Sequence, residues 1–283
     1  MDNLRQIIKS AEKNKVAIGH FNISDLTALK AIFEAAEELN VPVIIGTSQG
    51  EADFLDRQEA AALVKALREK NDFPIFLNAD HAHSFEEVKE AVEAGYDAVL
   101  FDAGKLSLDE NIRQTKKAVE LAKSINPDIL VEGELGYIGS SSRVMEKLPK
   151  GLSNLTSPED AARFAEETGV DLLAPSIGNV HGIIKGGNPK LDIKRIKDIR
   201  KVVGTPLVLH GGSGISDDDF KKAIEAGISV IHINTELRIA WRKGMEEGLK
   251  DNPEEIAPYK VLPEAVAEIK EVVYNRLKLF NRL

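Results

Sequence analysis

Short apolar runs rich in β-branched residues alternate along this chain with longer segments whose apolar positions recur at helical spacing. Short runs of this kind predict buried strands, and the longer segments predict amphipathic helices. The predicted strands are Val16–Phe21, Pro42–Thr47, Pro74–Asp80, Asp97–Asp102, Ile129–Glu134, Val170–Ile177, Pro206–His210 and Ser229–Thr235. The predicted helices between them include Leu26–Leu39, Asp56–Lys70, Ser84–Ala94, Asn111–Ser124, Pro158–Thr168 and Ile193–Val203.

Regular alternation of strands and helices is typical of an α/β protein with a parallel sheet. Eight such strands in 283 residues predict a (β/α)8 TIM barrel. An open doubly wound sheet is the alternative, but it usually carries a glycine-rich turn after its first strand, where this chain has His20-Phe21-Asn22. We expect a single domain over residues 1–283 with extra terminal helices, including an amphipathic one over Pro263–Leu283.

The segment Gly136–Asn154 is long and polar for a connection between a strand and a helix. Insertions of this kind at the catalytic face of a barrel are often mobile lids. We therefore expect a lid here.

Composition and charge limit the binding partners, the metal ligands and the cellular location that we expect for this protein. The net charge of −9 and the lack of a long basic run argue against nucleic acid or an anionic membrane as partner, although a local basic pocket could bind phosphate. The chain has no cysteine, so any metal must rest on His, Asp and Glu. No apolar run approaches the roughly 18 residues that span a bilayer, and no signal peptide is evident. We expect a soluble cytoplasmic protein.

Three histidines stand at the ends of separate apolar runs: His81, His181 and His210. Each one alone could be a hydrogen-bonded loop or core histidine. In a barrel, however, the carboxyl ends of the strands meet at one face, so the three imidazoles would converge. Neutral imidazole is a preferred zinc ligand. The pattern therefore predicts a metal site.

Carboxylates accompany these histidines. Asp80 directly precedes His81, and we expect the two side chains to lie near one another but to project to different sides. Glu132 and Glu134 are two apart on one strand, so they share a face, and their apolar neighbours disfavour the alternative of full exposure. Asp102 closes the fourth strand at the same rim. Together these carboxylates could hold a second or mobile cation.

A phosphate site is indicated by Gly211-Gly212-Ser213-Gly214 after the seventh strand and Asn234-Thr235 after the eighth. Barrels commonly present backbone N–H groups to a phosphoryl group at this place. A plain glycine turn is the alternative. Lys185 could add a positive charge.

Taken together, the motifs resemble those of the class II, metal-dependent ketose-bisphosphate aldolases, which include the fructose- and tagatose-bisphosphate aldolases, over nearly the whole chain. The segments that carry the resemblance are 17–22, 47–50, Asp80-His81, 132–136, 178–182, 209–214 and 233–237. The resemblance implies that His81, His181 and His210 bind a catalytic zinc. It implies that Asp80 exchanges the proton of the substrate's C4 hydroxyl, and that Glu134 with Asp102 matches a second cation site.

The resemblance also places residues around the dihydroxyacetone phosphate part of the substrate or in the same pocket. They are Asn22, Ser48, Gly182, Lys185, Gly211, Gly212, Ser213, His232, Asn234 and Thr235. Cleavage of the C3–C4 bond leaves an enediolate, whose negative oxygen needs a Lewis acid unless a Schiff-base lysine forms an iminium. The sixth strand has no lysine, so the metal mechanism is favoured.

The chain departs from the family pattern at three places. Asp102-Ala103-Gly104 stands where Asp-Gly-Ser is typical, His232 where asparagine is usual, and the lid reads Ser140-Ser141-Ser142-Arg143 where many relatives have acidic residues. Glu146 is a nearby candidate for the lid carboxylate.

We expect a zinc-dependent aldolase of glycolysis that splits fructose 1,6-bisphosphate into dihydroxyacetone phosphate and glyceraldehyde 3-phosphate. Tagatose bisphosphate or another ketose phosphate, a noncatalytic phosphate-binding barrel and a metal-assisted phosphoesterase stay open as alternatives. The resemblance and the apolar terminal helix imply a homodimer or homotetramer.

Overall fold

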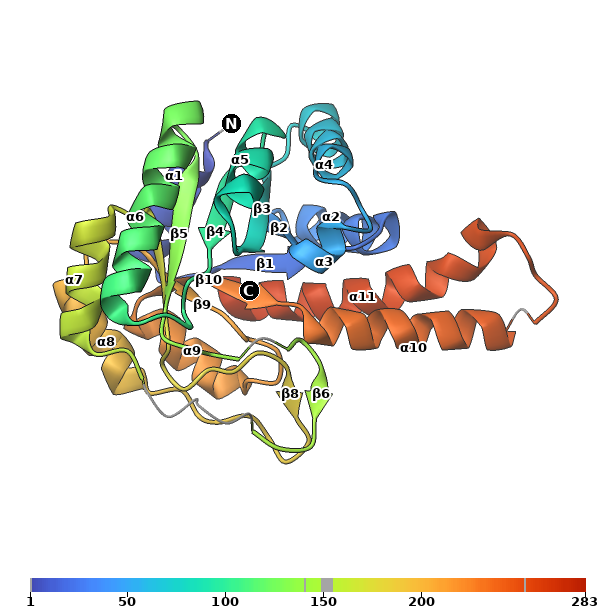
Figure 1. Cartoon of the computed structure of the whole chain (residues 1–283). Helices are drawn as coiled ribbons and strands as arrows, with labels where there is room; N and C mark the ends of the chain where they lie inside the picture. Colours follow the sequence, from blue (N-terminus) through green and yellow to red (C-terminus); the bar gives the residue numbers. More distant parts are fainter. Residues whose placement is uncertain (1, 140, 149–154, 252) are drawn as a thin grey trace.

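A closed barrel of parallel strands forms the centre of the molecule, seen in a computed structural model that describes residues 2–139, 141–148, 155–251 and 253–283 (Figure 1). The strand order around the barrel is β1-β10-β9-β7-β5-β4-β3-β2. The strands are β1 Ile18–Asn22, β2 Val43–Ser48, β3 Ile75–Ala82, β4 Ala98–Phe101, β5 Leu130–Leu135, β7 Leu172–Pro175, β9 Leu207–Leu209 and β10 Ile228–Ile233. The predicted (β/α)8 barrel is confirmed, and the open sheet is excluded because β1 pairs with β10.

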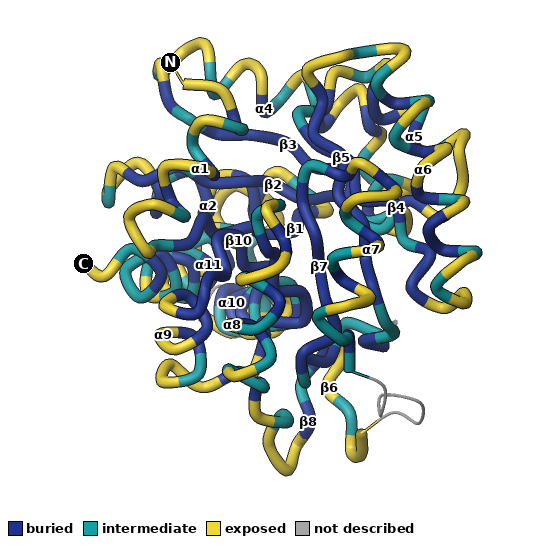
Figure 2. The backbone as a smooth tube through the Cα atoms, turned by 90° about the vertical axis from the view of Figure 1, so that its left-hand side faces the viewer, coloured by how far each residue is buried: buried dark blue, intermediate teal, exposed yellow. Residues whose placement is uncertain are grey.

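Helices between the strands surround the barrel. They are α2 Leu26–Leu39, α3 Gln49–Ala52, α4 Arg57–Asn71, α5 Phe85–Glu93, α6 Leu108–Ile125, α7 Pro158–Thr168, α8 Ile193–Val202 and α9 Asp217–Ala226. Several begin at a polar residue whose side chain accepts a backbone N–H of the first turn, as Ser107, Ser157 and Ser216 do. The strands of the barrel are buried and the outer faces of these helices are exposed (Figure 2).

The amino end of the barrel is closed by the N-terminal helix α1, Leu4–Asn14. Its apolar side chains pack against one layer of inward-facing residues from all eight strands. This layer consists of Ile18, Ile44, Phe76, Ala98, Leu130, Leu172, Val208 and Val230. Since inward positions recur every second residue, the next layer toward the carboxyl ends contains His20, Gly46, Asn78, Glu132, His210 and His232. On most strands the barrel interior thus changes from apolar to polar within two residues, whereas β4 and β7 continue with the apolar Leu100 and Ala174.

The chain ends in a helical hairpin, α10 Thr235–Asp251 and α11 Pro258–Asn281, which extends away from the barrel (Figure 1). Two predicted boundaries are wrong here. Thr235 begins α10 and does not belong to the eighth strand. The terminal helix begins at Pro258, five residues before the predicted start, because Pro258 occupies the first turn, where a missing N–H costs little, and Pro263 is accommodated within the helix.

Two short strands, β6 Val144–Met145 and β8 Ile183–Ile184, pair outside the barrel. They join the loops that follow β5 and β7, so part of the predicted lid is anchored to a second loop. Residues 140 and 149–154 of that lid lie outside the described residues. Among the described helices, none is long and apolar enough to cross a membrane.

Candidate active site

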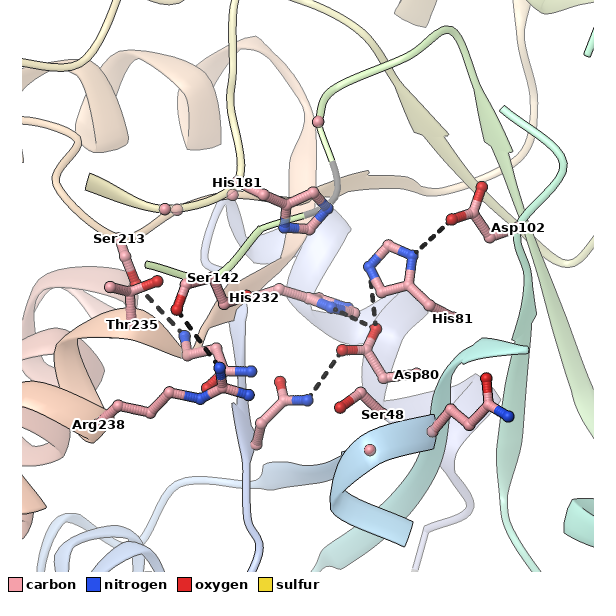
Figure 3. A pocket seen from close by; sticks show the side chains of 18 of the residues that line it. Ser48, Asp80, His81, Asp102, Ser142, His181, Ser213, His232, Thr235 and Arg238 are labelled. Carbon is pink, nitrogen blue, oxygen red and sulfur yellow. Dashed lines mark hydrogen bonds and ion pairs between the residues drawn. The ribbon is translucent and has the colours of Figure 1, made fainter. Parts of the chain in front are cut away.

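A cavity of about 250 Å³ opens at the carboxyl ends of the barrel strands (Figure 3). The predicted site residues that line it are Asn22, Ser48, Asp80, His81, Asp102, His181, Gly182, Gly211, Gly212, Ser213, His232, Asn234 and Thr235. His210 and Glu134 are buried beside it, at 0% and 2% exposure. Arg238 also lines the cavity, and sequence reasoning did not identify it. The structure therefore brings together most of the residues that the motifs indicated.

The three histidines converge from separate parts of the chain. His81 lies on β3, His210 directly follows β9, and His181 lies in the loop between β7 and β8 rather than at a strand end. The ring centroid of His81 is 4.8 Å from that of His181 and 5.1 Å from that of His210. With Glu134, the histidines offer four donor atoms that all lie within 4.8 Å of one another.

These donors fit a divalent cation. Within the described part of the chain, the buried atoms Glu134 Oε2, His181 Nε2 and His210 Nδ1 make no hydrogen bond, although Glu134 Oε2 and His210 Nδ1 lie 3.4 Å apart. Leaving buried polar atoms unpaired is costly, and coordination would satisfy them. Three imidazole nitrogens and one carboxylate oxygen are ligands that zinc prefers.

Two carboxylates orient the histidine rings. Glu132 Oε1 lies 2.7 Å from His210 Nε2, and Asp102 Oδ2 lies 3.0 Å from His81 Nδ1. Each contact occupies one ring nitrogen. The other nitrogen of His210, Nδ1, lies 3.4 Å from Glu134 Oε2, and the other nitrogen of His81, Nε2, lies 3.7 Å from Asp80 Oδ1. Carboxylates commonly fix metal-binding histidines in this way. Asp102 therefore contacts a histidine of the donor group and is not itself one of its four members.

Burial and charge act against each other in this cluster. Burial lowers the pKa of His81, but the carboxylates of Asp80, Asp102 and Glu134 outweigh it and raise the pKa to about 9. Burial also acts to lower the pKa of His210, and Glu132 and Glu134 raise it well above its usual value. For His181, burial and the other two histidines together hold the pKa well below its usual value. Burial and Asp102 raise the pKa of Glu134.

A β-bulge determines how Asp80 and His81 point. The pairing of β3 with β4 shifts between Ala79 and Ala82, and His81 has a φ of 57°. In a regular strand neighbours would face opposite sides, whereas here both side chains line the cavity, with His81 Nε2 3.7 Å from Asp80 Oδ1 (Figure 3). The expectation that the two project to different sides is wrong for this reason.

His20 and His232 form a buried stack beneath Asp80. They are register neighbours on β1 and β10, and their ring centroids are 3.5 Å apart with an interplanar angle of 2°. His20 Nε2 lies 3.0 Å from Asn78 Nδ2, and His232 Nδ1 lies 3.4 Å from Asp80 Oδ1. The nitrogen lone pairs of an imidazole lie in the plane of its ring, so those of two parallel stacked rings lie in parallel planes, which disfavours tetrahedral coordination of one ion by both. The stack is therefore better suited to shaping the cavity floor.

Glycines shape the loops predicted to hold phosphate. Gly211 has a φ of 60°, and a Cβ there would lie 2.4 Å from the carbonyl oxygen of Val180. Gly182 has a φ of 89°. Ser213 Oγ accepts the backbone N–H groups of Asn234 and Glu236 at 3.3 Å, which fixes the loop against the start of α10.

Lys185 is not brought into the cavity. Its ammonium group pairs with Glu146, and both side chains are exposed. Arg238 on α10 instead supplies a cation to the cavity lining, and it contacts Glu51 Oε1 at 2.7 Å. The only sequence signal for Arg238 was its position one helical turn after Asn234-Thr235.

Comparison with known proteins is consistent with this geometry. The family model "Fructose-bisphosphate aldolase class-II" matches residues 2–282. The chain is 37% identical to the "Probable fructose-bisphosphate aldolase" of Bacillus subtilis (strain 168) over 282 residues, which cover 99% of this chain and 97% of that protein. It is also 37% identical to the "Fructose-bisphosphate aldolase" of Staphylococcus aureus (strain Mu50), with 99% and 96% covered.

Among solved structures, the YdjI aldolase from Escherichia coli K12 superposes with a TM-score of 0.83 at 32% identity, covering 99% of this chain and 97% of that one. The resemblance inferred from the motifs is thus confirmed over nearly the full length. The chain belongs to the class II fructose-bisphosphate aldolase family.

Proposed function

We propose that this protein is a zinc-dependent aldolase that reversibly cleaves fructose 1,6-bisphosphate into dihydroxyacetone phosphate and glyceraldehyde 3-phosphate. The family is metal-dependent and its members are carbon–carbon lyases. The observation that carries the proposal is a set of buried atoms on His181, His210 and Glu134 that form no hydrogen bond with any described residue and lie beside the carboxylate of Asp80. Tagatose 1,6-bisphosphate, which differs in configuration at C4, is the alternative substrate.

In this proposal His81, His181 and His210 would hold the cation, and Glu134 would be the fourth donor. A bound divalent cation would act as a Lewis acid toward the substrate's carbonyl oxygen. Glu132 and Asp102 keep His210 and His81 in the orientation that binding requires. Asp102 and Glu134 would hold a second cation, which belongs to the same proposal.

Asp80 is the proposed acid/base residue. Burial acts to raise its pKa, but His81 and His232 outweigh it and hold the pKa well below its usual value, so the carboxylate is ionised at neutral pH. In cleavage it takes the proton of the C4 hydroxyl. The C4–O electrons form the aldehyde, and the electron pair of the C3–C4 bond stays with the triose phosphate fragment. In condensation the same carboxyl group returns the proton.

The loop after β9 and the start of α10 form a region that can bind one of the two phosphates of a bisphosphate. Gly211, Gly212 and Ser213, with Asn234 and Thr235 at the start of α10, can surround one phosphate with backbone N–H groups and a helix N-terminus.

Other predicted contacts complete this binding proposal. Gly182, Asn22, Ser48 and His232 would contact the sugar, and Lys185 would have to leave Glu146 to reach it.

The remaining expectations also stay proposals. We propose that residues 1–283 form one domain, that the protein acts in the cytoplasm, and that it assembles as a homodimer or homotetramer. Support for assembly comes from exposed apolar residues toward the tip of the α10–α11 hairpin, Leu249, Ile256 and Tyr259. A monomeric mass by light scattering would refute the assembly.

The test is release of triose phosphate from fructose 1,6-bisphosphate by the purified protein, with added zinc, after chelation and after zinc is restored. Triose phosphate release that is lost on chelation and regained with zinc supports the proposal. A parallel assay with tagatose 1,6-bisphosphate measures which of the two sugars the protein prefers. Release of inorganic phosphate instead would indicate a phosphoesterase, and no product from either sugar would favour the noncatalytic barrel. Asp80→Asn should keep the metal and slow cleavage by roughly 10²–10⁴-fold.

A further inference from the structure

Glu51, on the short helix α3 after β2, is a buried carboxylate at the edge of the cavity that no sequence motif indicated. Its side chain receives hydrogen bonds from four other residues. Ser48 donates its backbone N–H and its hydroxyl to Oε2, each at 2.8 Å. Asn22 Nδ2 donates to Oε2 at 2.8 Å, and Oε1 accepts from Asn234 Nδ2 at 3.1 Å and from Arg238 Nη2 at 2.7 Å.

Helix capping accounts for only part of this arrangement. Ser48 and Glu51 form a capping box, in which the glutamate side chain accepts the backbone N–H of the N-cap residue Ser48. The donors from Asn22, Asn234 and Arg238 come from β1, the end of β10 and α10, so they are not needed to start a helix. Glu51 is also only 6% exposed, although glutamate is seldom buried without partners. The carboxylate therefore links elements that are far apart in the sequence.

Asn22 connects Glu51 to Asp80. Its Nδ2 group donates to Glu51 Oε2 at 2.8 Å and to Asp80 Oδ2 at 2.9 Å, so its two hydrogens hold two carboxylates. Glu51 thereby fixes the amide, and the amide fixes one oxygen of Asp80. The other oxygen, Asp80 Oδ1, accepts no hydrogen bond from the described residues and lies 3.4 Å from His232 Nδ1 and 3.7 Å from His81 Nε2. The amide of Asn22 therefore anchors one oxygen, and the other faces two imidazoles at the cavity.

We infer that Glu51 is a positioning residue, which aligns Asp80 for proton transfer through the amide of Asn22 and holds Arg238 at the cavity wall. This inference rests on the proposed aldolase function. Only a carboxylate suits the position, because both oxygens must accept hydrogen bonds. Glutamine has the same shape, but its NH₂ group would face donors on one side and break part of the network.

The test compares two reactions of the zinc-loaded enzyme in the variant Glu51→Gln. Cleavage of fructose 1,6-bisphosphate needs Asp80 at the C4 hydroxyl. The second reaction is exchange for deuterium of a hydrogen on the hydroxymethyl carbon of dihydroxyacetone phosphate, which corresponds to C3 of the bisphosphate, followed by NMR. This exchange does not need Asp80 at a C4 hydroxyl, because the triose has no C4. Misplacement of a reacting group by about 1 Å can cost about 10²-fold. We expect kcat for cleavage to fall roughly 10–100-fold, while the maximum exchange rate stays within about twofold of the wild type.

The matched control is Glu167→Gln on α7, which removes an exposed carboxylate paired with Arg163 and should change neither rate. Wild-type cleavage in Glu51→Gln would overturn the inference. Equal loss of cleavage and exchange would also overturn it, because that pattern indicates damage to the metal site or the fold.

A measurement without turnover separates this inference from the proposed function. If the wild type cleaves no ketose bisphosphate, the proposed function fails, but the network can still be tested by urea unfolding of Glu51→Gln, Asn22→Ala and the double variant. Shared hydrogen bonds predict a non-additive shift of the unfolding midpoint. Additive shifts would overturn the inference whatever reaction the protein catalyses.

Discussion

Replacing Gly46 with alanine tests how the polar layer of the barrel is built. Gly46 lies on β2, between Asn22 on β1 and Asn78 on β3 in the strand register. A Cβ atom there would lie 2.2 Å from His20 Cε1, 2.7 Å from His20 Nε2 and 3.2 Å from Asn22 Cγ. The imidazole of His20 therefore occupies the space in which a side chain at position 46 would lie.

The short contact with His20 determines how much stability the substitution should cost. To reach a normal separation of about 3.4 Å, the ring of His20 must move by about 1.2 Å, although it is stacked on His232 and hydrogen-bonded to Asn78. Overpacking of this kind typically costs about 1–3 kcal/mol, and loss of the Asn78 contact adds about 1 kcal/mol. Lower entropy of the unfolded chain offsets about 0.4–1 kcal/mol. We expect Gly46→Ala to lower the free energy of unfolding by about 1–3.6 kcal/mol.

The assay is equilibrium unfolding in urea, followed by circular dichroism. Gly204→Ala is the matched control, because a Cβ at Gly204 meets nothing within 4 Å. The double variant Gly46→Ala/His20→Asn should recover part of the loss, since the shorter side chain withdraws from the new methyl group. If Gly46→Ala is as stable as Gly204→Ala, the packing assigned to His20 is wrong.

Three further changes test other parts of the site. Burial lowers the pKa of His20 from 6.5 to about 4, so stability that is present above pH 6.5 is lost as the pH falls toward 4, by about 3 kcal/mol. His20→Asn should show a smaller loss between pH 7 and 4.5 in urea unfolding, and an unchanged pH dependence would contradict this. His210→Ala should abolish tight zinc binding, measured by competition with a coloured chelator, and wild-type affinity would exclude His210 as a ligand. Gly211→Ala places a methyl group 2.4 Å from the carbonyl oxygen of Val180, at a residue whose φ is 60°. We therefore expect KM for the bisphosphate to rise about tenfold or more. An unchanged KM would place the phosphate elsewhere.

The sequence by itself determined the barrel and much of its chemistry. Eight short apolar runs alternate with helical segments, and local periodicity is sufficient to predict such elements. The period of two along a strand also placed Glu132 and Glu134 on one face, and both are buried in the barrel. The parallel arrangement explains why His81 and His210 meet, since the carboxyl ends of all strands lie at one face.

Tertiary structure alone decided which groups touch. The bulge at His81 turned two adjacent residues toward one cavity, and no local pattern indicated it. Glu132 pairs with His210 across 78 positions of sequence, and Glu51 contacts Arg238 across 187. Such contacts depend on strand register, backbone bulges and side-chain rotamers, which many distant residues set together. Periodicity fixes the face on which a residue lies, whereas its partner is fixed only when the barrel closes.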